Sequence, residues 1–297
     1  MMSWCLPFSR QRYKVSEKME NPQMSVDEML KYIRDFSLDG GVHGNQGYQR
    51  VLLQLFGLVG SGKSLLINSC KYVLEGGEYV MHASDEPTAV RKTYQLTPNI
   101  TIADNRPMIG HYDRDLPTLY AQLGSFLPLD ERVEKLYEYE DLVEKVEETD
   151  LAPNSTDLIV PVLVYCGTVW IEGDKTEMSS ILRGCRTMTG LFPIIIITRK
   201  NNPSAEETGR QFRLAGAEQV VLVENYTKED HLRTLGKDTA ILTFLRSALE
   251  DVTFRMSERR DVIRERAERK KFLIKYMHHV VLEREIQKLR ATHRSSR

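Results

Sequence analysis

The sequence predicts a doubly wound α/β fold, in which a mostly parallel β-sheet carries helices on both faces and is followed by a C-terminal helical extension. Segments typical of strands alternate with segments typical of helices, which is the order that produces such a sheet. Two strand-like segments, residues 158–165 and 193–198, are nearly continuous β-branched and apolar runs, as expected for strands buried on both faces. A glycine-rich loop between the first strand and the first helix is the third observation.

The pattern of apolar residues places the remaining elements. The expected strands are residues 50–56, 93–96, 100–103, 158–165, 193–198 and 219–223. The expected helices between them are residues 65–74, 175–189, 205–214 and 230–252. An antiparallel second strand near Thr93 would suit the Ras-like variant of this fold. One domain is therefore expected over residues 48–252 of the 297-residue chain, a length that fits a single core.

Residues 1–47 are expected to form an N-terminal extension. Ser25 and Glu28 have the spacing of a capping box, which predicts a short helix beginning there. The apolar residues at helical spacing are Met29, Ile33 and Phe36. Four glycines within residues 40–47 predict a linker to the domain.

An acidic insertion is expected at about residues 112–156. Within it, residues 130–150 hold ten acidic and three basic side chains, with apolar residues interspersed. We interpret this segment as a solvated helix, and a disordered acidic loop is the alternative.

Residues 253–297 predict a basic, charged C-terminal helix over about 254–290. From residue 251 onward there are 14 Lys and Arg against 7 Asp and Glu, although the whole chain has a net charge of −1. A sustained heptad pattern is missing, so this helix is expected to dock on its own domain or to mediate partner binding or self-association. Because basic and acidic residues alternate at helical spacings, we expect ion pairs rather than nucleic-acid binding, with a membrane surface as a weaker alternative.

The glycine-rich loop has the pattern G-x-x-x-x-G-K-S of a P-loop. Glycines let the backbone aim successive N–H groups at phosphate oxygens, and the helix N-terminus adds its positive dipole end. Lys63 would reach the β- and γ-phosphates, and the Ser64 hydroxyl would bind Mg²⁺. The residues assigned to phosphate binding are Gly57, Val59, Gly60, Ser61, Gly62, Lys63, Ser64 and Leu65.

A Mg²⁺ site is expected beside this loop. Asp104 follows a predicted strand and is the candidate metal-linked carboxylate, with a plain turn residue as the alternative. Thr88 lies in an irregular segment where its hydroxyl could bind Mg²⁺ and its backbone could hold the γ-phosphate. Thr93 is the rival, but we expect it to lie inside a strand and to face away. The predicted metal ligands are thus Ser64, Thr88 and Asp104.

A base-binding site is expected after the strand at residues 193–198. GTPases carry the sequence N/T-K-x-D at this position, and here it reads Thr198-Arg199-Lys200-Asn201. An asparagine amide should pair poorly with guanine, whose N1–H and 2-amino group both donate hydrogen bonds. Thr198, Arg199 and Asn201 are nevertheless predicted to contact the base, with Asn225 approaching from the loop after the last strand.

These residues together resemble the interferon-induced protein 44 family, over roughly residues 48–252. The resemblance is carried by the P-loop with Asn68-Ser69, the Thr88 segment, Arg91-Lys92-Thr93-Tyr94, Val223-Glu224-Asn225-Tyr226, Ala240-Ile241-Leu242 and Leu245-Arg246. It implies a cytoplasmic protein with a GTPase-like domain that binds GTP or GDP with Mg²⁺, and a role in the interferon or innate immune response.

The sequence departs from the GTPase pattern after Asp104. GTPases have D-x-x-G there, but Pro107 stands in place of the glycine and has no N–H to offer the γ-phosphate. No glutamine stands nearby to orient a water. Lys63, Thr88 and Arg106 are the expected catalytic residues, with Arg106 either an internal arginine finger or a solvated loop residue. We therefore expect a switch with slow GTP hydrolysis, or else an interaction scaffold with altered specificity for ATP or XTP and no turnover.

Composition narrows the cellular context. Four scattered cysteines without C-x-x-C pairs indicate reduced thiols and a cytoplasmic location. No apolar run reaches the length of a membrane span, and no secretory signal is evident near the start. Cys5 is expected to be an idle thiol, with palmitoylation as the alternative.

Overall fold

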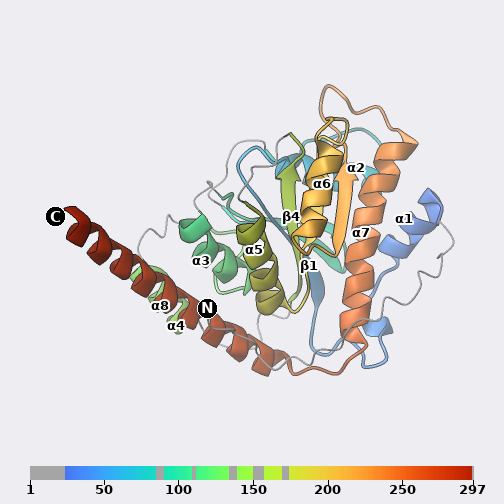
Figure 1. Ribbon diagram of the computed structural model, residues 1–297. Coiled ribbons are helices and arrows are strands. Elements are labelled where there is room, and N and C mark those ends of the chain that lie inside the picture. Colours follow the sequence, from blue (N-terminus) through green and yellow to red (C-terminus); the bar gives the residue numbers. More distant parts are fainter. Residues whose placement is uncertain are drawn as a thin grey trace.

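The computed structural model describes residues 24–84, 90–108, 112–133, 139–149, 157–168 and 174–295 (Figure 1). The predictions made for Cys5 and Thr88 fall outside these residues. Within them, a central sheet is covered by helices on both faces, and a long C-terminal helix crosses one side of the domain and extends beyond it.

The sheet has six strands in the order β2-β3-β1-β4-β5-β6. Their bounds are β1 Arg50–Phe56, β2 Lys92–Thr97, β3 Ile100–Asp104, β4 Asp157–Cys166, β5 Ile194–Thr198 and β6 Gln219–Val223. Every neighbouring pair is parallel except β2 and β3. The predicted mostly parallel sheet with an antiparallel second strand is confirmed.

Burial explains why the central strands could be recognised. All five residues of β5 are buried, as are the eight central residues of β4, because helices cover both faces. One core lies under α1 (Val26–Arg34), α2 (Lys63–Glu75) and α7 (Leu235–Met256). The other lies under α3 (Tyr112–Leu123), α4 (Tyr139–Glu148), α5 (Asp174–Thr189), α6 (Ala205–Leu214) and α8 (Val262–Ser295).

The N-terminal helix α1 begins with the predicted capping box. The backbone N–H of Ser25 donates to the Glu28 carboxylate at 2.7 Å, and the backbone N–H of Glu28 donates to the Ser25 hydroxyl at 3.3 Å. The hydrogen bonds to Ser25 lower the pKa of Glu28. Met29 and Ile33 are buried in the core that includes α7, so α1 is part of the domain's packing. A short 3₁₀ helix, η1 (Leu38–Gly40), follows.

The described residues of the acidic insertion form two helices. The predicted helix within residues 130–150 is confirmed as α4, whose Leu142 and Val146 are buried. The sequence did not indicate α3, which packs against α5 and α8 and places Tyr120 in the core. Pro117 lies inside α3. Because proline disfavours the interior of a helix, this residue argued against predicting a helix here.

The prediction that the C-terminal helix begins at about residue 254 is wrong. Helix α7 continues to Met256, and α8 begins only at Val262. Gln46 bridges the break: its amide donates to the carbonyls of Met256 and Glu258, each at 3.0 Å, and its carbonyl accepts from the N–H of Arg260 at 2.8 Å. A distant side chain thus satisfies the backbone groups that a continuous helix would have bonded internally.

Helix α8 docks on its own domain through its middle part. Leu273 and Met277 are fully buried, and the ring of Tyr120 meets those of Phe272 and Tyr276 edge-on at 6.4 and 5.1 Å. The apolar side chains in the middle of this helix are therefore buried against α3. Among the described helices, none combines the length and apolar character needed to cross a membrane.

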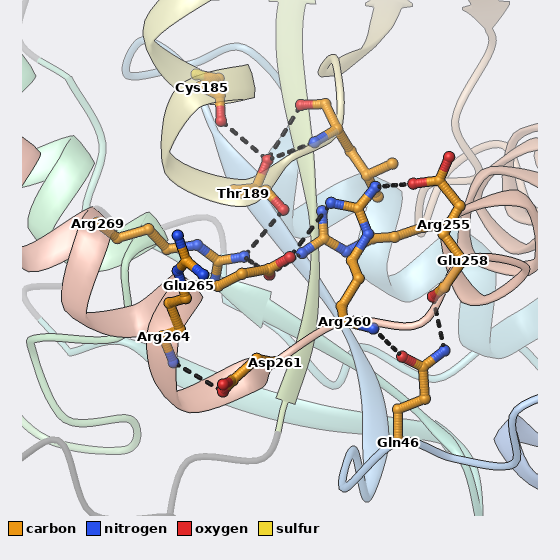
Figure 2. A network of polar contacts seen from close by, with 11 residues as sticks. Gln46, Cys185, Thr189, Arg255, Glu258, Arg260, Asp261, Arg264, Glu265 and Arg269 are labelled. Atoms are coloured by element: carbon orange, nitrogen blue, oxygen red, sulfur yellow. Dashed lines mark hydrogen bonds and ion pairs between the residues drawn. The ribbon is translucent and has the colours of Figure 1, made fainter. Parts of the chain in front are cut away.

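The predicted ion pairs near the start of α8 are present (Figure 2). Glu265 contacts Arg255 at 2.5 Å, Arg260 at 3.3 Å and Arg269 at 3.1 Å. Arg269 also donates to the carbonyl of Thr189, which ties α8 to α5. Burial lowers the pKa of Arg269 to about 10. Much of the basic charge here is neutralised within the chain, as the alternating charge pattern predicted.

Candidate nucleotide-binding site

The glycine-rich loop connects β1 to α2 at the carboxyl edge of the sheet. Gly57 has a φ of +149°, and a Cβ placed there would lie 2.1 Å from the carbonyl oxygen of Val164. Gly60 and Gly62 have φ of +74° and +90°. Only glycine adopts such angles readily, so all three positions favour the glycine found there, two of them being the glycines of the motif, Gly57 and Gly62.

Lys63 is the first residue of α2, and its side chain curls over the loop. Its ammonium group donates to the carbonyls of Gly57 at 3.2 Å and Leu58 at 3.0 Å. Only 7% of the residue is exposed, and burial lowers the pKa of Lys63, while the nearby charge of Asp104 raises it. The loop therefore holds a single buried cation beside its backbone.

The first turn of α2 presents backbone N–H groups that have no helical carbonyl to bond. Within the described part of the chain, no hydrogen bond from the N–H groups of Gly60, Lys63 or Ser64 is seen. Val59 differs, because its N–H donates to the carbonyl of Met108 at 3.2 Å. Binding of phosphate by the Val59 amide would need that bond to open, and it stays a prediction.

Ser64 and Asp104 meet beside the loop. The Ser64 hydroxyl donates to Oδ2 of Asp104 at 3.2 Å, and Asp104 is the last residue of β3, paired in register with Leu55 of β1. Burial raises the pKa of Asp104, whereas the charge of Lys63 and the bond from Ser64 lower it. Two of the three predicted metal ligands, Ser64 and Asp104, are thus brought together.

The donor set fits Mg²⁺ better than a metal caged by protein alone. A hydroxyl and a carboxylate are hard oxygen ligands, and Mg²⁺ is usually held by one or two protein groups with phosphate oxygens and waters. Within the described residues, no group of three or more His, Cys, Asp and Glu side chains could hold a metal ion. Ser64 and Asp104 are the residues that would hold Mg²⁺, directly or through a water.

Thr93, the alternative to Thr88 as a metal ligand, forms hydrogen bonds with Asp130 instead. It lies in β2, and both its backbone N–H and its hydroxyl donate to the Asp130 carboxylate, at 2.7 Å to Oδ1 and 2.7 Å to Oδ2 respectively. The expectation that Thr93 lies inside the strand is confirmed. The role predicted for Thr88 lies outside the described residues and stays a prediction.

Two of the predicted base-site residues hold the loop from the neighbouring strand ends. The Thr198 hydroxyl at the end of β5 donates to the carbonyl of Ser61 at 2.8 Å, and the Asn225 amide after β6 donates to the carbonyl of Gly62 at 3.3 Å. Asn225 is 6% exposed, and its Oδ1 has no partner within the described residues. The structure thus brings the ends of β1, β5 and β6 together.

The other two predicted base-site residues are exposed beside them. Arg199 has a φ of +55°, which is uncommon for a residue other than glycine, and Asn201 follows in the same turn. The backbone N–H of Asn201 donates to the Glu224 carboxylate at 3.1 Å. Sequence reasoning did not include Glu224 among the candidate site residues, although it contacts this turn. An acidic residue next to the predicted Asn225 was the signal that could have found it.

The loop after Asp104 is held by bonds along its length. The N–H of Asn105 donates to the carbonyl of Leu55 at 3.2 Å, and that of Arg106 to the Gln122 side chain at 3.0 Å. The N–H of Met108 donates to the carbonyl of Gly57 at 3.0 Å. Arg106 is half-buried in this loop. Its predicted catalytic role stays a prediction.

The strand order, the G-x-x-x-x-G-K-S loop after β1 and the Ser64–Asp104 pair define a P-loop domain with the Ras-like GTPase fold. The chain matches no protein-family model and no curated protein. A solved structure, that of Toc33 from Arabidopsis thaliana in complex with GDP and Mg²⁺, is similar with a TM-score of 0.38 and 15% identity, over 71% of this chain and 87% of that one. The resemblance to the interferon-induced protein 44 family stays a prediction.

Proposed function

We propose that this protein binds GTP with Mg²⁺ and acts as an intracellular switch whose hydrolysis of GTP is slow. The observation that carries the proposal is the arrangement at the start of α2, where the Lys63 ammonium, the Ser64 hydroxyl and the Asp104 carboxylate converge on a glycine-rich bend. This combination supplies a cation, backbone donors and hard oxygen ligands, the three groups that a triphosphate with Mg²⁺ requires.

Lys63 would exchange its present acceptors for phosphate. Its ammonium now bonds two neutral carbonyls, those of Gly57 and Leu58, while burial disfavours its charge. An anionic phosphate oxygen is a stronger acceptor than a carbonyl. Binding should therefore draw Lys63 off the loop and relieve the cost of burying its charge.

Glu224 supports guanine as the base. Guanine presents two adjacent donors, N1–H and the 2-amino group, which a carboxylate accepts and an asparagine amide does not match. Asn201 occupies the position where GTPases place their aspartate, and its own N–H donates to the Glu224 carboxylate. We infer that Glu224, reaching over from the loop after β6, supplies the acceptor that Asn201 lacks.

Slow hydrolysis follows from what surrounds Asp104. Pro107 offers no N–H where GTPases have a glycine, and the Asn105 amide bonds the buried side chains of Arg91 and Gln54. Asn105 is therefore poorly placed to orient an attacking water. Arg106 is the remaining candidate for stabilising the transferred phosphate, and Thr88 would complete the Mg²⁺ site.

A nucleotide-free scaffold is the second candidate function. It is favoured by the bonds that close the loop on itself, from Lys63 to Gly57 and Leu58 and from Val59 to Met108. If these bonds persist in solution, the fold would serve as a platform without turnover, or would accept ATP or XTP weakly.

The cellular setting is part of the proposal. We place the switch in the cytoplasm, since Cys70, Cys166 and Cys185 are free thiols, and an interferon-linked role rests on the family resemblance. A protein partner or a second copy could contact the outer part of α8, where Leu282, Ile286 and Leu289 are exposed. A membrane surface is less favoured, because many basic residues are paired.

Calorimetric titration with GTP, GDP, ATP and XTP in the presence of Mg²⁺ tests the proposal. GTP should bind most tightly, and Lys63→Ala should weaken it by about a hundredfold or more, because a charge-assisted contact is lost. Lys71→Ala, on the same helix but bonded to the Gln95 carbonyl and to Glu75, is the matched control and should bind normally. Absence of binding by the unaltered protein would favour the scaffold, and tighter binding of ATP would reject the guanine assignment.

A further inference from the structure

Arg91 is a fully buried arginine at the entrance to β2. Its exposed fraction is 0%, and it heads the fully buried side chains of the domain by volume. A buried guanidinium normally lies against a carboxylate, because isolating its charge from water is costly. The groups that bond Arg91 therefore decide how its buried charge is stabilised.

The guanidinium bonds only neutral oxygens among the described residues. Its Nε donates to Oδ1 of Asn105 at 3.0 Å, and one terminal nitrogen donates to Oε1 of Gln54 and to the carbonyl of Gln122, each at 3.1 Å. The other terminal nitrogen donates to the carbonyls of Leu127 and Pro128. Burial lowers the pKa of Arg91 to about 10, so it stays charged at neutral pH.

These acceptors come from three parts of the domain that meet behind the candidate metal site. Asn105 directly follows Asp104, and Gln54 lies in β1 just before the phosphate loop. Gln122 belongs to the end of α3, and its side chain accepts the N–H of Arg106. A planar group with five fixed donors can hold three such segments in one geometry, which a lysine cannot do.

The backbone of Arg91 is held as firmly as its side chain. Its N–H donates to the carbonyl of Glu131 at 3.1 Å, and its carbonyl accepts from the N–H of Asp130 at 2.7 Å. Asp130 also accepts from Thr93. Arg91 thus has little freedom to follow a displacement of the Asp104 loop, and the loop must adopt the position that Arg91 sets.

We propose that Arg91 is a positioning residue that fixes the Asp104–Met108 loop against the phosphate loop and couples the metal site to the segment after α3. Through Asn105 and Gln54, it keeps the Asp104 carboxylate at the Ser64 hydroxyl. Through Gln122, Leu127 and Pro128, it links that carboxylate to the acidic insertion. The coupling to Mg²⁺ rests on the proposed function, whereas the fixing of the loop does not.

The first measurement uses the full-length, nucleotide-free protein. Hydrogen exchange in a peptide covering residues 104–108 should be about tenfold faster in Arg91→Lys. The Asn105 side chain, and Gln122 that accepts the Arg106 N–H, would then lose their bonds to the guanidinium. Arg255→Lys is the matched control: Arg255 is 4% exposed, lies near the end of α7 and bonds Glu265 in the first turn of α8. It should leave exchange at residues 104–108 unchanged.

The second measurement is the ratio of GTP dissociation constants with EDTA and with Mg²⁺. Arg91→Lys should reduce this ratio about tenfold while the affinity in EDTA changes little, because the substitution displaces a metal ligand and leaves the contacts to the nucleotide itself intact. A merely structural arginine would lower stability without altering the ratio. If the unaltered protein binds no nucleotide, the proposed function fails, and the exchange measurement still decides on the loop.

If Arg91→Lys does not fold, a second variant tests the same proposal. Gln54→Met keeps the side chain's length and removes the acceptor that Arg91 and Asn105 share. Exchange at residues 104–108 should again rise. Unchanged exchange in the folded variants, or an equal rise in Arg255→Lys, would overturn the proposal.

Discussion

The Ser64 hydroxyl donates to the Asp104 carboxylate at 3.2 Å, which joins the start of α2 to the end of β3. The parallel pairing of β1 with β3 produces this contact, because it places both carboxyl ends at the same edge of the sheet. The contact unites a residue of the first helical turn of α2 with a strand residue 40 positions later in the chain. It also brings together the two oxygen-bearing side chains of the candidate metal site.

Asp104→Asn should therefore remove the dependence of GTP affinity on Mg²⁺. The amide keeps the shape but loses the negative charge that attracts the metal, so affinity in Mg²⁺ should fall about tenfold or more while affinity in EDTA stays the same. Asp157→Asn is the control, since Asp157 pairs with Arg50 at the start of β4. Titration calorimetry in both buffers measures the effect, and an unchanged Mg²⁺ dependence would remove Asp104 from the metal site.

Gly57→Ala should destabilise the domain far more than Gly60→Ala. The added Cβ at Gly57 would lie 2.1 Å from the Val164 carbonyl oxygen, whereas at Gly60 nothing lies within 4 Å. Urea unfolding should show a loss of roughly 3 kcal/mol for Gly57→Ala, from the clash and the strained φ, and about 1 kcal/mol for Gly60→Ala, from φ alone. Equal losses would mean that β4 does not close over the loop as described.

Glu224→Gln should weaken GTP and leave ATP unaffected. The substitution keeps the acceptor for the Asn201 N–H but replaces the carboxylate with an amide, so about tenfold of GTP affinity should be lost. ATP presents a different pattern of base donors and should not respond. Competition titrations compare the two nucleotides, with Glu229→Gln as a control in the same region.

A second substitution tests whether a carboxylate at this position selects guanine. Asn201→Asp restores the aspartate of the GTPase pattern and should recover GTP affinity in the Glu224→Gln background. If Glu224→Gln binds GTP as well as the unaltered protein does, Glu224 does not read the base.

Local patterns allowed much of this fold to be predicted from the sequence. The β5 strand was recognisable because five consecutive residues are buried on both faces, and α1 because its capping box is local. The phosphate loop was found because glycine is demanded at fixed positions by backbone angle. Each of these signals involves residues close together in the chain.

The features that the sequence did not indicate depend on distant residues. Arg91 meets Asn105, Gln122 and Gln54 at separations of 14, 31 and 37 positions. The break between α7 and α8 contains no glycine or proline, and Gln46, more than 200 positions earlier, bonds the carbonyls there. Such contacts follow from tertiary packing, which no local periodicity records.

Asp251 should make the stability of the folded protein depend on pH. Burial raises the pKa of Asp251 to about 7, the neighbouring charges of Glu218 and Glu250 add to the effect, and a hydrogen bond from Gln219 opposes it. The folded state therefore holds a proton that the unfolded state, with its pKa near 4, releases more readily. The stability that this proton provides is fully present below about pH 4 and is lost as pH rises through 7.

Asp251→Asn should abolish this dependence, because the amide has no proton to lose. The variant's free energy of unfolding should exceed that of the unaltered protein at pH 8 by on the order of 2 kcal/mol, allowing for partial exposure of the carboxylate, and should match it near pH 4. Urea unfolding at a series of pH values between 4 and 8 measures both curves. Asp261→Asn, beside Arg264 at the start of α8, is the control. Parallel curves for Asp251→Asn and the unaltered protein would show that folding does not raise the pKa of Asp251.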